Sequence, residues 1–382
     1  MLAYSRTFDQ LAGWTVKIGL MLRAHDRPGG IGIYSKNIVK HLLEIDSDNH
    51  YVLMYNNPDH VGSYSHLDNV DELYAPPANP LIWDQWVTPR LMKKWAVDLI
   101  FHTKFTVPLA TRAKTIMALH GASWYVHPEI YGKFDVFYVK CTMPIYCRRA
   151  DFMISNSDLT TKDHIELLDV PPEKISTVYF AASKEFHCID DVSVLDRIRK
   201  KYDLPDRFML TVTSYDPAKN FATLLSAFEI CREEDDIHLV VTGKNCARYG
   251  LDHDIRGRGL EGVIHFPGWI NHDDLPAIYN LATVYAFPSI YETFGIPVLE
   301  SMACGCPVVS SDRGAVPELV GDAALMSDAM DADALARNLL KIVTSAESAQ
   351  HYRAAGLEQV KKFSWTKTAQ QTLKIFQNVV GA

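Results

Sequence analysis

The chain has 382 residues, of which 48% are hydrophobic, and it carries a formal net charge of −8 with a pI near 6. This length favours two domains, each with its own core. The acidic balance lacks the basic stripe of a nucleic-acid-binding protein, so we expect no nucleic-acid partner. The seven scattered cysteines are expected to be reduced thiols in a cytoplasmic protein. No apolar run reaches the roughly 18 residues that span a bilayer, and residues 1–15 lack the apolar core of a signal peptide.

The first half of the chain alternates short apolar runs with helical patterns. Such runs are typical of parallel strands that are covered by helices on both faces of the sheet. In chain order, the clearest elements are TVKIGLML (15–22), IYSKNIVKHLLEI (33–45), YVLMYN (51–56), DLIFHT (98–103), KTIMALH (114–120), DFMISNS (151–157) and KISTVYF (174–180). We therefore predict a doubly wound α/β domain over residues 1–185.

The second half repeats this alternation and predicts a second doubly wound domain over residues 186–365, with the junction near residues 182–206. Open parallel sheets bind ligands at the carboxyl ends of their strands, so the cleft between the domains is the expected ligand site. The expected elements are RFMLTVTS (207–214), KNFATLLSAFEICRE (219–233), HLVVTG (238–243), VIHFPGW (263–269), DDLPAIYNLA (273–282), TVYAFPS (283–289), IPVLESMA (296–303), PVVSSD (307–312) and DADALARNLLKIV (331–343).

Two strand ends in the first domain carry candidate site residues. In RPGGIGIY, Gly29, Gly30 and Gly32 follow the first strand and precede a helix, where backbone amides are available to an anion. The alternative is a plain tight turn, because a short glycine-rich loop is a weak signal. His120 ends the strand KTIMAL and is either a ligand-binding or a purely structural histidine.

Lys219 is the first candidate in the second domain, at the strand-to-helix turn TVTSYDPAKN beside Asn220. A lysine at the start of a helix meets the positive end of the helix dipole, so its position favours a bound anion. A solvated surface lysine is the alternative interpretation.

Seven residues separate Glu292 from Glu300 in the segment SIYETFGIPVLE. Pro297 suits the first turn of a helix, which places Glu300 on the helix and Glu292 on the preceding loop. The amides of Phe294, Gly295 and Ile296 would then lie at the helix N-terminus. Carboxylates bind hydroxyls and amides suit phosphate, so the segment fits a ligand with both groups. Alternatively, the two carboxylates only favour the helix dipole.

At these residues the chain resembles the retaining glycosyltransferases of family four, above all in PSIYETFGIPVLESMACGCPVVSSDRGAVPELVGDAALM (288–326). The resemblance implies the GT-B fold, with two Rossmann-like domains facing a deep interdomain cleft and a final helix, about 366–382, packed back on the first domain. It implies a hexosyltransferase that moves a mannose- or glucose-type sugar from GDP- or UDP-hexose to a glycan or lipid-linked acceptor.

The resemblance also assigns roles to residues of this chain. Glu292 would bind the donor sugar, Glu300 the ribose, Lys219 the diphosphate and His120 the transferred sugar. The other donor-binding residues implied are Gly30, Gly32, Gly268, Trp269, Ile270, Phe294, Gly295 and Ile296. The family's usual arginine is absent, since Ser214 or Ala218 occupies its position. The candidate substitutes are Lys244 and, beside the glycine loop, Arg23 or Arg27. Thr293 stands where the family has a glycine.

Three further expectations concern cofactors, rival functions and membranes. No Asp-x-Asp motif stands at the end of an expected strand, so we expect neither a metal nor another cofactor. A nucleotide-sugar epimerase, an inverting transferase or a non-catalytic nucleotide-sugar-binding protein is the alternative function.

The stretch VFYVKCTMPIYCRRAD (136–151) combines aromatics with Lys140, Arg148 and Arg149, as a helix in peripheral contact with the inner face of a membrane would. An ordinary helix packed on the first domain is the simpler interpretation, because three basic residues attract a membrane weakly.

Overall fold

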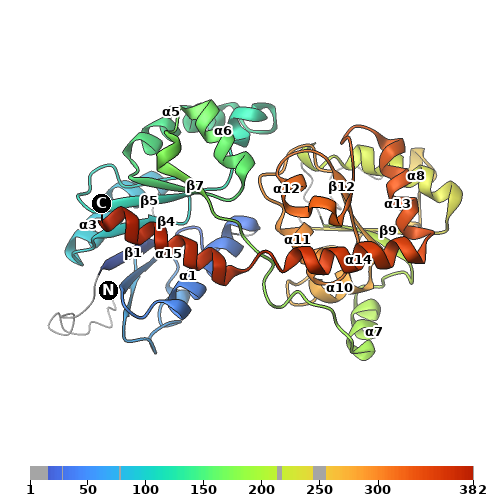
Figure 1. Cartoon of the computed structure of the whole chain (residues 1–382), viewed down its shortest axis with the longest axis horizontal. Coiled ribbons are helices and arrows are strands. Elements are labelled where there is room, and N and C mark those ends of the chain that lie inside the picture. Colours follow the sequence, from blue (N-terminus) through green and yellow to red (C-terminus); the bar gives the residue numbers. More distant parts are fainter. Residues whose placement is uncertain (1–15, 28, 77–78, 213–216, 244–254, 382) are drawn as a thin grey trace. The chain divides into compact units, whose positions relative to one another are not determined.

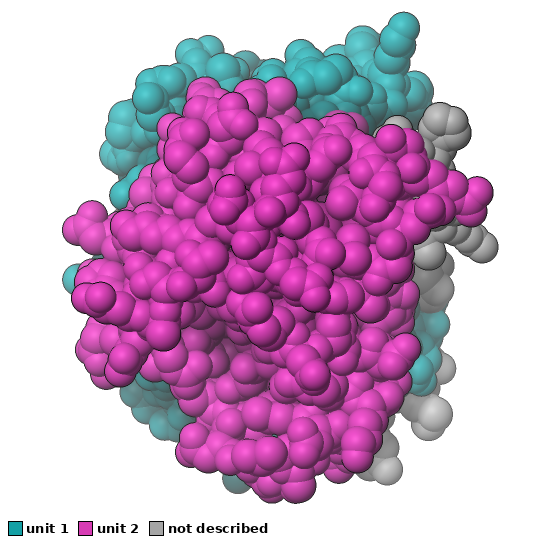
Figure 2. All heavy atoms as spheres, turned by 90° about the vertical axis from the view of Figure 1, so that its right-hand side faces the viewer, with its two compact units in different colours: residues 1–180, 365–382 teal, residues 181–364 magenta. Residues whose placement is uncertain are grey.

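The computed structural model describes residues 16–27, 29–76, 79–212, 217–243 and 255–381 (Figure 1). The chain forms two compact units, coloured separately in Figure 2. Unit 1 comprises residues 1–180 and 365–382, and unit 2 comprises residues 181–364. The chain thus passes between units at residue 180, whereas the sequence analysis placed the boundary at residue 185.

Unit 1 contains a seven-stranded parallel sheet in the order β3-β2-β1-β4-β5-β6-β7. The strand order reverses between the neighbours β1 and β4, and the carboxyl ends of strands at such a switch point are where open α/β sheets bind ligands. The strands are β1 (Lys17–Met21), β2 (His50–Tyr55), β3 (Val70–Tyr74), β4 (Leu99–His102), β5 (Lys114–Leu119), β6 (Phe152–Ser155) and β7 (Ile175–Thr177).

Helices pack on this sheet through regularly spaced apolar side chains. In α1, the buried Tyr34, Ile38 and Leu42 recur every four residues and so share one face of the helix. The helical segments of unit 1 are α1 (Gly30–Ile45), η2 (Pro58–His60), α2 (Pro80–Ile82), the π-helix η3 (Trp83–Val87), α3 (Thr88–Lys94), α4 (Ser123–Val126), η4 (Pro128–Ile130), α5 (Lys133–Arg149), α6 (Asp158–Leu168), η5 (Pro172–Lys174) and α15 (Trp365–Gly381).

The C-terminal helix α15 belongs to unit 1, where it packs against α1. Its Phe376 meets Phe101 of β4 edge to face at 5.1 Å between ring centroids, and Trp365 stacks on Phe180 at 5.7 Å. Thr368 also donates a hydrogen bond of 2.6 Å to the carbonyl of Tyr179. The end of the chain therefore completes the core of the unit in which the chain begins. No helix among the described residues is long and apolar enough to cross a membrane.

Unit 2 contains a six-stranded parallel sheet in the order β10-β9-β8-β11-β12-β13, which reverses between β8 and β11. Its strands are β8 (Phe208–Val212), β9 (His238–Thr242), β10 (Ile264–His265), β11 (Val284–Phe287), β12 (Val308–Ser311) and β13 (Leu325–Ser327). Its described helical segments are α7 (Val192–Lys201), η6 (Pro217–Lys219), α8 (Phe221–Glu234), α10 (Leu275–Leu281), α11 (Ile296–Ala303), α12 (Val316–Val320), η8 (Gly321–Ala323), α13 (Ala332–Val343) and α14 (Ala346–Val360). The prediction of two parallel α/β domains is confirmed.

Candidate active site

The switch point of unit 2 brings Lys219 and Glu292 together. Lys219 ends η6, which follows β8, and Glu292 lies on the loop after the neighbouring strand β11. The Lys219 ammonium donates a hydrogen bond to Glu292 Oε2, and it also lies 5.4 Å from the centroid of the Phe287 ring. The two side chains are only 23% and 18% exposed. A half-buried ion pair therefore occupies the position at which this class of sheet binds its ligands.

Asn220 holds the Lys219 loop in place. Asn220 adopts the left-handed conformation at φ 56°, which a short polar side chain tolerates. Its side-chain nitrogen donates hydrogen bonds to the carbonyls of Pro288 at 3.0 Å and Ala329 at 2.5 Å, and its oxygen accepts one from Thr223 at 2.8 Å. Asn220 is buried, so these bonds tie the lysine-bearing turn to the loop that leads to Glu292.

Gly314 and Ala315 support the Glu292 loop from the other side. The Ala315 amide donates a hydrogen bond of 2.8 Å to the Glu292 carbonyl. A Cβ on Gly314 would lie 2.5 Å from that carbonyl oxygen and 2.6 Å from the Glu292 nitrogen, and φ at Gly314 is +68°. Only glycine fits this position, for both steric and conformational reasons. No local sequence motif marks Gly314, because its close contact lies 22 residues away in the chain.

The segment after Glu292 turns into α11 at Gly295, which is the N-cap residue with φ 109°. This backbone conformation favours glycine, and Phe294 and Ile296 on either side are buried. The three residues expected to carry donor-binding amides therefore lie at the N-terminal end of α11.

Glu300 lies on α11 with only 3% of its surface exposed. Burial raises the pKa of its carboxyl to about 8, and the nearby Tyr279 hydroxyl partly offsets this effect. The charge of Glu300 also contributes to raising the pKa of Tyr285 on β11, though burial is the larger cause. Glu292 and Glu300 therefore occupy different environments, one paired with a cation and the other enclosed by tyrosines.

The remaining predicted residues of unit 2 are differently exposed. Gly268 has φ +80°, and its carbonyl accepts a hydrogen bond of 3.0 Å from Thr242 at the end of β9. Trp269 is 64% exposed, whereas Ile270 is buried. Among Gly268, Trp269 and Ile270, the Trp269 ring is therefore the apolar surface that a ligand could reach. Lys244 and Ser214 lie outside the described residues.

In unit 1, the glycine loop has a clear structural function. Gly29 caps α1 with φ 83°, and Gly30 is the first residue of that helix. A Cβ on Gly32 would lie 1.8 Å from the carbonyl oxygen of Arg27, so Gly32 allows the loop after β1 to fold tightly onto the first turn of α1. This contact explains Gly32 through packing, independently of any ligand.

His120 follows β5, and a hydrogen bond from its ring nitrogen Nε2 fixes the orientation of the ring. Nε2 lies 2.8 Å from the Thr103 carbonyl, which can only accept, so Nε2 carries the proton. Burial lowers the pKa of His120 to about 4, and the ring packs edge to face on Tyr34 at 5.1 Å. His120 is therefore a neutral imidazole with a fixed tautomer, and Nδ1 is its hydrogen-bond acceptor.

No group of three or more His, Cys, Asp or Glu side chains within the described ranges is arranged to hold a metal ion. The candidate residues thus form two separate groups, each described within its own unit: the Lys219–Glu292 pair with Glu300 in unit 2, and His120 with the glycine loop in unit 1.

Comparison with known proteins agrees with this fold. A family model described as Glycosyl transferases group 1 matches residues 195–359, and one described as Glycosyltransferase Family 4 matches residues 28–181. The O-antigen chain mannosyltransferase B of Escherichia coli is 30% identical over 292 residues, covering 74% of this chain and 76% of that protein.

Solved structures with the same architecture include sucrose-phosphate synthase from Thermosynechococcus elongatus, with a TM-score of 0.77 and 20% identity over 96% of this chain and 99% of that one. Anabaena HepE in complex with UDP-glucose has a TM-score of 0.72 and 18% identity over 95% and 100% of the two chains. The two parallel-sheet units and these similarities define an enzyme of the GT-B class. The chain belongs to the group 1 glycosyltransferases of family four.

Proposed function

We propose that the enzyme transfers a hexose of the mannose or glucose type from GDP- or UDP-hexose to an acceptor hydroxyl, with retention of anomeric configuration. The Lys219–Glu292 pair at the β8–β11 switch point is the observation that carries this proposal. The similarity to a mannosyltransferase of O-antigen chains favours a role in glycan, polysaccharide or glycolipid synthesis, and HepE, which has the same fold, was solved with UDP-glucose.

The proposed reaction breaks the bond between the anomeric carbon and the diphosphate oxygen and forms a bond from that carbon to the acceptor oxygen. Negative charge develops on the diphosphate, and stabilising this charge is the main task of the protein. Lys219 supplies the cation, and the N-terminal end of α11 supplies the positive end of a helix dipole. Glu292 orients the Lys219 ammonium before the donor binds and then accepts hydroxyls of the donor sugar. The acceptor proton passes to the leaving diphosphate.

We expect the product to keep the anomeric configuration of the donor and turnover to survive EDTA, because the site offers a cation and a helix N-terminus for the diphosphate. The measurement is NMR of the product anomer, after thermal-shift screening of UDP, GDP and ADP sugars to identify the donor. An inverted product would refute the retaining mechanism. A sugar nucleotide with altered stereochemistry and no transfer would indicate the epimerase alternative.

We also propose that the enzyme works at the cytoplasmic face of a membrane through α5. The inner face of this helix is buried, but Phe134, Phe137 and Ile145 are 79%, 67% and 46% exposed. Lys140 and Arg148 are exposed on the same helix. Outward aromatics combined with basic residues are typical of a helix that lies in the interface of an anionic membrane.

This proposal predicts that the protein floats with phosphatidylglycerol vesicles more than with phosphatidylcholine vesicles. The double substitution Phe134→Ser and Phe137→Ser should abolish flotation, because it removes the apolar contact while keeping the charges. Leu167→Ser is the matched control, since Leu167 is exposed on another helix of the same unit, α6. Equal flotation of the double variant and the control would argue against α5 as the docking surface.

A further inference from the structure

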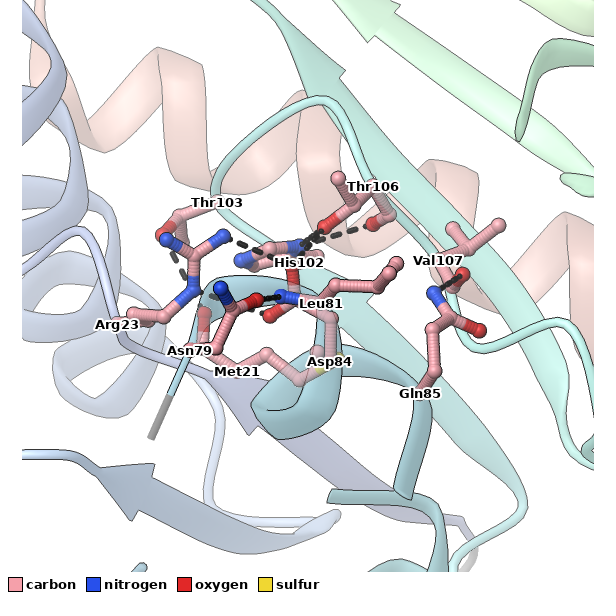
Figure 3. Close-up of polar contacts among 10 residues, drawn as sticks. All are labelled: Met21, Arg23, Asn79, Leu81, Asp84, Gln85, His102, Thr103, Thr106 and Val107. Atoms are coloured by element: carbon pink, nitrogen blue, oxygen red, sulfur yellow. Dashed lines mark hydrogen bonds and ion pairs between the residues drawn. The ribbon is translucent and has the colours of Figure 1, made fainter. Parts of the chain in front are cut away.

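A cluster of cations lies at the switch point of unit 1, where the structure adds Lys104 to the two arginines, Arg23 and Arg27, that the sequence offered as candidate phosphate partners. Arg23 and Arg27 lie on the loop after β1, and Lys104 follows the neighbouring strand β4. Asp84 on η3 is the carboxylate whose negative charge interacts with these cations. Figure 3 shows Arg23 and Asp84 facing each other beside His102 and Thr106.

Asp84 is fully engaged by its neighbours. Arg23 donates two hydrogen bonds to its carboxylate, from Nε to Oδ1 at 3.0 Å and from Nη2 to Oδ2 at 2.7 Å. The Thr106 hydroxyl donates a third hydrogen bond, of 2.9 Å, to Oδ2. A bidentate pair of this kind is among the strongest ionic contacts in proteins. Asp84 therefore neutralises Arg23 and, among the residues that the structure describes, leaves Arg27 and Lys104 without a counter-ion of their own.

Lys104 is the unusual member of the cluster. It is only 7% exposed, and its ammonium makes no hydrogen bond or ion pair with any residue that the structure describes. The ammonium lies over the Phe105 ring, 4.8 Å from its centroid. Burial, together with the charges of Arg27 and Arg23, lowers the pKa of Lys104 to about 7. An ammonium on a side chain this little exposed, beside two arginines, destabilises the unit unless a bound anion compensates.

The local backbone favours an anion at the same place. The carbonyl of Arg27 packs on Gly32 in the first turn of α1, which brings the Arg27 loop to the start of that helix. The α1 helix has 16 residues, no side-chain cap and no acidic residue in its first turn. Its positive dipole end is therefore uncompensated. The nearby His102 and His120 add no charge, because burial lowers the pKa of each to about 4.

We propose that Lys104 and Arg27, backed by the Arg23–Asp84 pair and the start of α1, bind a phosphate group of a substrate on unit 1. This inference rests on the proposed function for the identity of the substrate. The phosphate belongs either to the diphosphate of the sugar donor or to a phosphate-bearing acceptor. Phosphate matches the site because it carries more charge than a carboxylate and accepts hydrogen bonds from several cations at once.

The first test measures phosphate binding without turnover. Thermal shifts with inorganic phosphate and pyrophosphate are recorded in a Lys219→Met background, which removes the cation of unit 2. Adding Lys104→Met should abolish the shift and weaken pyrophosphate binding roughly tenfold or more, as expected for loss of a charged hydrogen bond. Lys104→Arg should retain the shift, and Lys94→Met, at an exposed lysine on α3, should leave it unchanged.

A structural role for Lys104 predicts a different result. Without phosphate, Lys104→Met should melt at or above the temperature of its parent, because the substitution removes an unpaired buried charge and keeps the side-chain length. If Lys104→Met retains the full phosphate shift, or if it melts lower and still binds pyrophosphate as tightly as its parent, the proposed site is wrong. Neither outcome depends on transferase activity, so failure of the proposed function would be seen separately, in the product assay.

The second test identifies the source of the phosphate in the otherwise unchanged protein. Calorimetry with UDP and GDP probes the donor, and calorimetry with farnesyl phosphate, a short polyprenyl phosphate, probes a lipid-linked acceptor. A loss of roughly tenfold in nucleotide affinity in Lys104→Met assigns the site to the donor diphosphate. The same loss for farnesyl phosphate assigns it to the acceptor. Unchanged affinity for all three probes would overturn the proposal.

Discussion

Replacing Lys219 with Met is expected to weaken nucleoside diphosphate binding by roughly 1.5–3 kcal/mol, or about tenfold to a hundredfold, while nucleoside binding stays unchanged. The reason is that the ammonium contacts only the diphosphate in the proposed complex. In the ligand-free structure, Lys219 is bound to Glu292, so the substitution also leaves a half-buried carboxylate without its cation. Turnover should therefore fall further than affinity. Calorimetry with UDP and uridine, or with GDP and guanosine, separates the two effects.

The matched control is Lys361→Met, which removes the lysine of an exposed ion pair with Glu358 in the same unit. Surface pairs of this kind contribute little, so nucleotide affinity and turnover should both stay at the parental level. Glu292→Gln completes the comparison. It should lose turnover and keep nucleotide affinity, because Lys219 then remains available to the diphosphate. If Lys219→Met bound the diphosphate as tightly as the parent, the phosphate assignment of Lys219 would be refuted.

The sequence predicted the buried strands better than the edge strands. All six residues of β2 are buried, and such a strand appears in the sequence as a continuous apolar run. The edge strand β3, with the sequence VDELY, has one buried residue and was not expected. The three-residue strand β13 was also missed, since none of its residues is fully buried. The edge strands β7 and β10 were nevertheless predicted, because each lies within a longer apolar run. Local pattern thus identifies a strand by its apolar run and misses strands that are short or largely polar.

The candidate site shows a similar limit. Glu292 and Lys219 were identified separately, each from its own local motif. Their pairing depends on β8 and β11 being neighbours, which no local pattern predicts for residues 73 positions apart. Lys104 was missed because its importance arises from the charges of Arg23 and Arg27, on a loop after a different strand. Properties that come from the order of strands in a sheet are visible only in the structure.

The buried carboxyl of Glu300 carries a cost in stability that depends on pH. Burial raises the pKa of its carboxyl from the usual 4.5 to about 8 in the folded protein. Below pH 4.5 the carboxyl is protonated in both the folded and the unfolded chain and does not affect stability. Between these pH values it ionises only in the unfolded chain. Ionisation therefore favours unfolding, and the contribution of Glu300 to stability falls as the pH rises toward 8.

Replacing Glu300 with Gln should therefore stabilise the protein at pH 8 by roughly 2–4 kcal/mol and have little effect at pH 4.5. The measurement is the free energy of unfolding by urea at both pH values, with the exposed Glu347→Gln on α14 as the control. An equal effect of Glu300→Gln at both pH values would contradict a raised pKa. If Glu300 binds the ribose, the same variant should also lose roughly tenfold in affinity for the nucleotide, the effect of one buried hydrogen bond. A variant that is more stable but binds the nucleotide more weakly would show that the buried carboxyl of Glu300 contributes to ligand binding and lowers the stability of the fold.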